Sequence, residues 1–323
     1  MNKHERPMGT LERRIRAAES DLFAALNAEV EERFLDLEQM DLRVRVLSHG
    51  SGAPLLLMHG AASMAAAWAP LFAHLQGFRL LAVDLPGHGL SDPVRHRRGR
   101  VREHAHRLID GVLDALGLDD VPVAGHSLGG MFALWHVAAG SERISKVIAV
   151  APPAVALPGT RVRMPLSPLT VRGLGVAFLR WPSPRLIHRR VLAQGLGSAE
   201  VKMASDPLLE ALRLSTRRPE NARSVASLMH AIDRFRRARP ESILPAEELA
   251  AIRVPTTFIL GSDDPYLSPR DARPSIARIP NATVHEMTAG HGPWLVDPGR
   301  VAGLIAAHLE AAGEDNAAHL GAR

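Results

Sequence analysis

A serine stands in the middle of a Gly-x-Ser-x-Gly pentapeptide, between an apolar run at 121–124 and a nearly all-apolar segment at 128–139. A chain that passes from a strand to a helix within so few residues must reverse tightly, which holds Ser127 in strained backbone geometry with its hydroxyl exposed. Gly125 and Gly129 stand where a Cβ would clash across such a turn. The pattern predicts a nucleophilic serine; the alternative is a serine that caps the helix.

Two later segments provide the partners that such a serine needs. A serine hydroxyl is a weak nucleophile until a base takes its proton, and the base needs an anion to fix its tautomer. The segment 256–265 is typical of a buried strand followed by the carboxylates of Asp263 and Asp264. The segment 282–291 is typical of a strand followed by a loop that contains His291. The order along the chain is therefore serine, acid, histidine.

Four stretches together resemble the α/β-hydrolase superfamily, in particular its lid-bearing esterases, lipases and C–C hydrolases. The stretches are His59–Ala62, Asp84–Ser91, Gly125–Gly129, and Gly261–Asp264 followed by Gly290–His291. The resemblance covers roughly residues 34–309, apart from the middle of the chain. It implies an α/β-hydrolase fold, in which a mostly parallel, doubly wound sheet of about eight strands carries an inserted helical lid.

The resemblance also implies a role for each of five residues. Ser127 would attack the substrate carbonyl, and His291 would act as the general base. Asp264 would orient the imidazole ring. The backbone N–H groups of Ala61 and Leu128 would form the oxyanion hole, the pair of donors that stabilises the oxygen on which charge develops.

The implied activity is hydrolysis of a carboxylic ester-like bond through an acyl-enzyme. Hydrolysis of a C–C, thioester or lactone bond is an alternative on the same fold, and a receptor-like protein that binds a ligand on a hydrolase scaffold is an alternative of another class. The segment 61–65 departs from the glycine-rich loop that C–C hydrolases tend to carry. The family spacing selects Asp264 as the acid and leaves Asp263 to hydrogen-bond its own turn, with an exchange of their roles left open.

Hydrophobic patterning predicts the elements that position these residues. Continuous apolar runs favour strands of a parallel sheet that is covered on both faces. They occur at 55–58, 80–83, 121–124, 147–150 and 258–260. Amphipathic stripes predict helices at 68–75 and 101–116 between these strands, and another at 11–30 before the core. The segment 33–47 predicts an antiparallel strand pair that turns near residues 40–41.

The chain is accordingly expected to divide into five parts. They are an N-terminal amphipathic helix (1–30), the first part of the core domain (31–152), a helical lid (153–247), the second part of the core (248–312) and a flexible tail (313–323). The lid region contains 16 Lys plus Arg against 7 Asp plus Glu. A solvated helical surface is the favoured interpretation of this charge. Steering of an acidic substrate and weak attachment to an anionic membrane are the alternatives.

Composition limits the other function classes. The absence of cysteine excludes disulfides and thiolate metal sites. No nucleotide-binding fingerprint occurs, and neither a metal nor a cofactor is expected. A single tyrosine and the lack of aromatic residues among the basic residues argue against binding of nucleic acid.

No apolar run is long enough to span a bilayer and no secretory signal is recognised, so a cytoplasmic location is the expectation. The expected partner is a small ester-like molecule, and the oligomeric state is open.

Overall fold

The computed structural model describes residues 9–153, 156–158, 169, 171, 173–233 and 237–311 of the chain. The predicted C-terminal tail lies outside the described residues, as do the first eight residues of the predicted N-terminal part.

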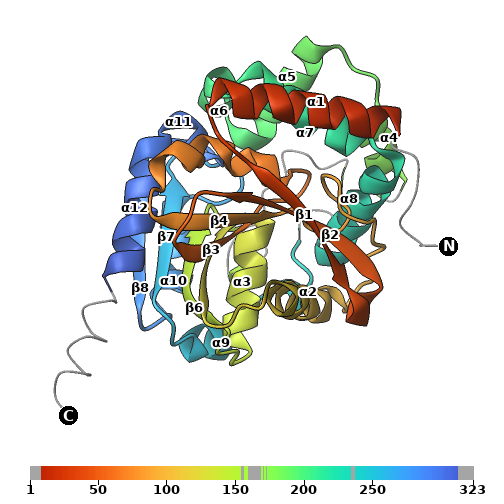
Figure 1. Ribbon diagram of the computed structural model, residues 1–323. Helices are drawn as coiled ribbons and strands as arrows, with labels where there is room; N and C mark the ends of the chain where they lie inside the picture. The colour runs from red at the N-terminus through yellow and green to blue at the C-terminus, as the bar shows by residue number, and fades with distance from the viewer. Residues whose placement is uncertain are drawn as a thin grey trace.

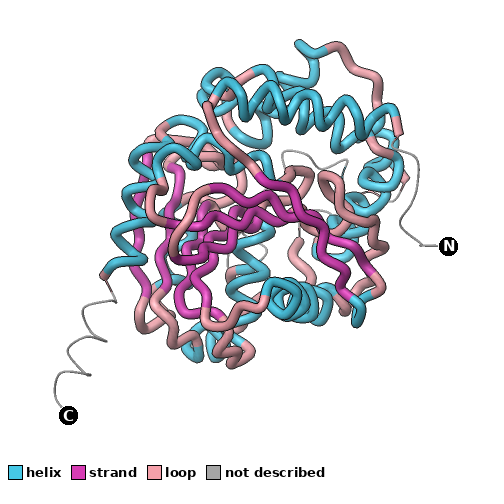
Figure 2. Tube along the Cα trace, viewed as in Figure 1, coloured by secondary structure: helices cyan, strands magenta, loops and turns pink. Residues whose placement is uncertain are grey.

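A sheet of eight strands forms the centre of the described part of the chain. Figure 2 shows the sheet in magenta, with helices in cyan around it. In spatial order its strands are β1 (Glu31–Leu37), β2 (Leu42–His49), β4 (Phe78–Val83), β3 (Ala53–Met58), β5 (Val121–His126), β6 (Ile144–Val150), β7 (Thr256–Gly261) and β8 (Ala282–Met287). Strand β2 pairs antiparallel with β1 and β4, and every other neighbouring pair is parallel. The predicted α/β-hydrolase fold is confirmed, and the predicted strand pair near residues 40–41 is the hairpin β1–β2.

Both faces of the sheet are covered, which explains its continuously apolar strands. In β3, Leu55 and Leu57 face one hydrophobic cluster, whereas Leu56 and Met58 face the other. The first face packs against η2 (Ala65–His74), α11 (Pro293–Val296) and α12 (Pro298–Glu310). The second packs against α2 (Val101–Leu116), α3 (Leu128–Ala138), α9 (Ala246–Ala251) and α10 (Pro269–Ile276). Figure 1 shows α12 beside β7 and β8, and α2 beside α3.

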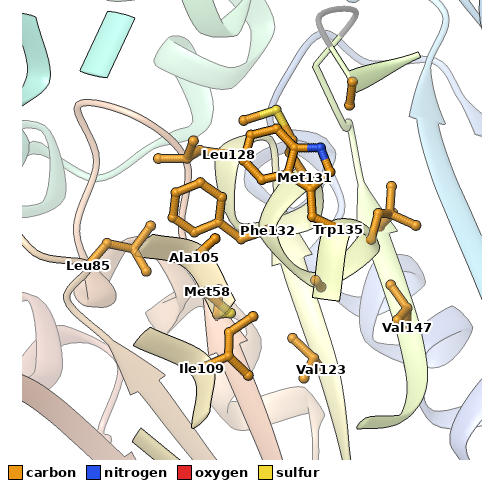
Figure 3. Close-up of a cluster of buried hydrophobic side chains, with 14 of the residues drawn as sticks. Met58, Leu85, Ala105, Ile109, Val123, Leu128, Met131, Phe132, Trp135 and Val147 are labelled. Carbon is orange, nitrogen blue, oxygen red and sulfur yellow. The ribbon is translucent and has the colours of Figure 1, made fainter. Parts of the chain in front are cut away.

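Helix α3, which follows the predicted nucleophile, is buried almost all round. In Figure 3 its residues Met131, Phe132 and Trp135 lie in one apolar cluster with side chains of the sheet and of α2. A Cβ added to Gly130 would come within 2.7 Å of the carbonyl oxygen of Gly125, so the glycine allows α3 to approach β5 closely. This packing fixes the start of α3, and with it the position of Ser127.

The predicted helix at residues 68–75 is a 3₁₀-helix in the structure, η2. Pro70 lies inside it. Proline has no N–H to donate and its ring clashes with the carbonyl four residues earlier, which disfavours a continuous α-helix. The apolar stripe is still buried, with Trp68 and Leu71 fully enclosed. The pattern therefore predicted the buried face correctly but not the helix type.

Five of the α-helices that the structure describes lie between β6 and α9, and we call them the helical insertion. They are α4 (Leu174–Arg180), α5 (Arg185–Leu196), α6 (Ser198–Met203), α7 (Asp206–Arg217) and α8 (Pro219–Ile232). Helix α1 (Thr10–Ala25) packs along α7 (Figure 1), and it ends at Ala25 rather than at the predicted residue 30. The division of the chain into domains stays a prediction. No helix in the described ranges is both long and apolar enough to cross a membrane.

A buried ion network joins three segments that lie far apart in the sequence. The guanidinium of Arg45 in β2 is fully buried, with Nε 2.6 Å from Oδ2 of Asp84 and Nη2 2.6 Å from Oε1 of Glu19 on α1. Asp84 also accepts hydrogen bonds from the backbone N–H groups of Ala65 and Leu90. Burial acts to raise the pKa of Asp84, but the Arg45 guanidinium, His59 and these two N–H groups together outweigh burial and leave that pKa below its usual value. Arg45 therefore pairs with both buried carboxylates. At Glu19 burial is the stronger influence and leaves the pKa above its usual value.

We expect Arg45→Met to lower the free energy of unfolding by about 3–5 kcal/mol, because it leaves two buried carboxylates without their cation. Urea denaturation measures this change. Arg79→Met is the matched control, since Arg79 is exposed on β4, and it should change stability by about 0.5 kcal/mol or less. Equal stability of the two variants would show that the network contributes little.

Candidate active site

The residues predicted to act together follow the carboxyl ends of parallel strands of the sheet. Ser127 follows β5, and Asp264 and His291 lie in the loops that follow β7 and β8. Ala61 follows β3, which pairs with β5. Because the strands are parallel, these ends share one edge of the sheet, where open α/β sheets bind their ligands.

The turn around Ser127 has the strained geometry that its sequence predicts. Ser127 has φ +47° and ψ −111°, a conformation that L-residues rarely adopt and that costs on the order of 1–3 kcal/mol. A Cβ on Gly125 would overlap the backbone of Gly129 and Gly130, and a Cβ on Gly129 would overlap the carbonyl of Met58. The glycines therefore make the turn sterically possible, and the surrounding packing holds the strain.

His291 and Asp264 form a buried pair. Nδ1 of His291 lies 2.8 Å from Oδ2 of Asp264, and both side chains are almost fully buried. The carboxylate accepts the proton of Nδ1, which leaves Nε2 as the basic nitrogen. Oδ1 of Asp264 accepts the N–H of Tyr266 at 2.7 Å, so Asp264 itself holds the turn. The expected hydrogen bond of Asp263 to the same turn is not found in the described part of the chain, where its side chain is exposed.

Ser127 and His291 line the same cavity. Within the described part of the chain, Oγ of Ser127 donates no hydrogen bond, so the two side chains face a common space without a direct bond. Such bonds are often long without a ligand and tighten only when substrate is bound. The structure thus brings hydroxyl, imidazole and carboxylate to one site.

Two backbone N–H groups beside Ser127 are available to an oxygen in this cavity. Leu128 is the first residue of α3, and its N–H has no partner four residues earlier within the helix. Ala61 lies in the loop after β3 and also lines the cavity. Neither N–H donates to a described group. Both residues line the cavity with Ser127.

Two aromatic side chains support His291 in ways that the sequence analysis did not predict. His126 precedes the serine, and its Nε2 donates to the carbonyl oxygen of His291 at 2.8 Å. Burial lowers the pKa of His126 well below its usual value and keeps the ring neutral. The Tyr266 ring lies 4.4 Å from the imidazole of His291, centroid to centroid. In the sequence, the position of Tyr266 two residues after Asp264 was the feature that could have predicted this contact.

The cavity above Ser127 is small and largely apolar, with a volume of about 150 Å³. The helical insertion supplies much of its wall through Leu192, Leu208, Leu212 and Met229. None of the described residues that line it is Lys, Arg, Asp or Glu. No group of three or more metal-ligating side chains occurs among the residues the structure describes. The site therefore suits a small apolar group next to the reacting atom.

Known proteins that are similar to this chain include hydrolases. A family model described as alpha/beta hydrolase fold matches residues 53–298. A 2-hydroxy-6-oxononadienedioate/2-hydroxy-6-oxononatrienedioate hydrolase of Cupriavidus pinatubonensis is 27% identical over 266 residues, which cover 78% of this chain and 86% of the relative. A 2-hydroxy-6-oxo-6-phenylhexa-2,4-dienoate hydrolase of Burkholderia cepacia is 25% identical over 76% of this chain and 83% of its own length. The crystal structure of a carboxylesterase from Bacillus subtilis superposes with a TM-score of 0.70 over 93% of this chain and 99% of its own, at 19% identity.

Proposed function

The chain belongs to the alpha/beta hydrolase family, and from that premise we propose that it hydrolyses a small carbonyl compound, with Ser127 as nucleophile. His291 acts as the base and Asp264 orients it. The observation that carries this proposal is the buried 2.8 Å contact between His291 and Asp264, in a cavity that His291 shares with a serine on a strained turn.

The proposed mechanism has two steps. Nε2 of His291 takes the proton of Ser127 as Oγ attacks the carbonyl carbon, and the N–H groups of Leu128 and Ala61 stabilise the oxyanion. The imidazolium then protonates the leaving group, and an acyl-enzyme remains. His291 next activates a water molecule, which releases the acid and restores the serine. Asp264 stays ionised and keeps the proton of the imidazole on Nδ1 during both steps.

For the bond that is cleaved, we propose a C–C bond beside a ketone. Both relatives are named as hydrolases of 2-hydroxy-6-oxo acids, which supports C–C cleavage over the ester cleavage that the sequence favoured. A carbon leaving group must depart as a stabilised carbanion that accepts a proton. The keto form of a 2-hydroxy-6-oxo-dienoate provides this stabilisation, because the departing fragment is a delocalised dienolate. The imidazolium of His291 is the proton donor within the cavity.

The apolar cavity favours a hydrophobic group on the ketone. Burial of an unpaired carboxylate in an uncharged cavity costs several kcal/mol. A phenyl ketone therefore fits better than a ketone whose substituent ends in a second carboxylate. The same lack of charge favours a second candidate, hydrolysis of a neutral ester by the same residues.

Three substrates separate these possibilities. We expect kcat/KM to be roughly 10²-fold higher for 2-hydroxy-6-oxo-6-phenylhexa-2,4-dienoate than for 2-hydroxy-6-oxononadienedioate, because only the second must bury an additional charge. Loss of the dienoate absorbance measures both rates, and p-nitrophenyl butyrate tests ester cleavage. Turnover of the ester alone would favour the second candidate. A folded protein that is inert toward all three would favour the ligand-binding alternative.

A further inference from the structure

A buried carboxylate on the helical insertion contacts the loop that carries His291. Glu200 lies on α6, and only 1% of its surface is exposed. Its carboxylate accepts the backbone N–H of Gly290, the residue before His291. No lysine or arginine pairs with it among the described residues. Burial raises the pKa of Glu200 despite the opposing effect of the backbone N–H groups of Glu200 and Gly290. A buried acid without a cation is costly to keep, so its position calls for an explanation.

The backbone around Glu200 is shaped to receive this carboxylate. Gly197, at φ +115°, precedes α6, and a Cβ there would overlap the Glu200 carboxylate. A Cβ on Gly290 would overlap the carbonyl of Leu196 and come within 3.0 Å of the Glu200 carboxylate. The two glycines therefore allow the junction of α5 and α6 to approach the histidine loop closely.

A second hydrogen bond joins the same two segments. The N–H of His291 donates to the carbonyl oxygen of Leu196, the last residue of α5, at 2.7 Å. Figure 1 shows α6 next to α11, the short helix that begins two residues after His291. The insertion thus binds two successive N–H groups of this loop, while His126 holds the carbonyl of His291 from the core side.

We propose that Glu200 is a positioning residue, which fastens the helical insertion to the loop of His291 and so couples the position of the insertion to that of the imidazole. The proposal rests on the proposed role of His291 in catalysis. Glu200 does not line the cavity, so it acts on the reaction through the histidine loop rather than through the substrate. Its removal should lower kcat and leave KM nearly unchanged.

The test compares Glu200→Met, Glu200→Ala and Glu200→Gln. Methionine keeps the length of the side chain but removes the acceptor, whereas the amide oxygen of glutamine can still accept the Gly290 N–H. Glu200→Met should fold, because it replaces a buried acid with an apolar group of similar length, and Glu200→Ala is available if it does not. The matched control is Glu247→Ala on α9, where the side chain is exposed.

Amide hydrogen exchange of residue 290 tests the contact without reference to activity. We expect exchange to accelerate about tenfold in Glu200→Met and Glu200→Ala, the factor expected for one lost hydrogen bond. Glu200→Gln should restore protection, and Glu247→Ala should match the wild type. Unchanged exchange in both Met and Ala variants would overturn the proposal.

Phosphonate labelling tests the effect on chemistry. The rate at which a fluorophosphonate labels Ser127 should fall about tenfold in Glu200→Met and recover in Glu200→Gln, if removal of the hydrogen bond displaces His291. A variant that loses amide protection but is labelled at the wild-type rate would refute the positioning role. Failure of the wild type itself to be labelled would instead reject Ser127 as the nucleophile, and the exchange measurement would still decide whether Glu200 holds the loop.

Discussion

Ser127→Ala is expected to lower kcat by roughly 10⁶, because nucleophile and base act as a unit and neither replaces the other. The methyl group keeps the side chain small, so the turn and the cavity should persist. The residual rate of the variant would come from substrate binding and from the N–H donors of Leu128 and Ala61. KM should change little.

The control for this prediction is a second serine in the same cavity. Ser63 also lines the space above Ser127, but it lies in the loop after β3 and away from the glycine turn. Ser63→Ala should keep kcat within about tenfold of the wild type, the size of an effect on a single hydrogen bond. Mass spectrometry after phosphonate labelling should find the adduct on Ser127. A Ser127→Ala protein with a tenth of wild-type kcat would remove the proposed mechanism.

The parts of the fold that could be predicted from the sequence are those that depend on a pattern within a short segment. Each central strand is a short apolar run, because the sheet is covered on both faces. The turn at Ser127 is recognisable because its geometry requires glycine two residues before and two residues after the serine. Asp264 and His291 each follow a strand, so their positions at the same sheet edge followed from parallel pairing.

The features that the sequence did not predict depend on contacts between distant segments. Nothing near Arg45 indicates that α1 and the loop after β4 would enclose it between Glu19 and Asp84. Glu200 likewise appears as one acid on a short helix, and only the folded chain places it against Gly290. The sequence alone could not show whether Asp263 or Asp264 faces His291, because the conformation of the turn sets the direction of each side chain. The spacing typical of the family was needed to select Asp264.

The basic character of the insertion is less marked near the cavity than its composition suggests. Arg189 lies 2.6 Å from Asp206, and Arg213 lies 2.6 Å from Glu210, within the insertion itself. Arg185 also approaches Glu210. No arginine is among the described residues of the cavity wall. These pairs support the solvated-surface interpretation over the steering of an acidic substrate.

Asp264→Asn is expected to lower kcat by roughly 10⁴ with little change in KM, because Asp264 does not line the cavity. The asparagine NH₂ group would donate to Nδ1 of His291, which puts the imidazole proton on Nε2 and prevents that nitrogen from accepting the serine proton. The amide oxygen can still accept the N–H of Tyr266, so the loop should keep its shape. Asp263→Asn is the matched control: it makes the same change one residue earlier, on an exposed side chain, and should leave kcat near the wild-type value. Steady-state kinetics of both variants decide the assignment, and a larger loss in Asp263→Asn than in Asp264→Asn would exchange the roles of the two aspartates.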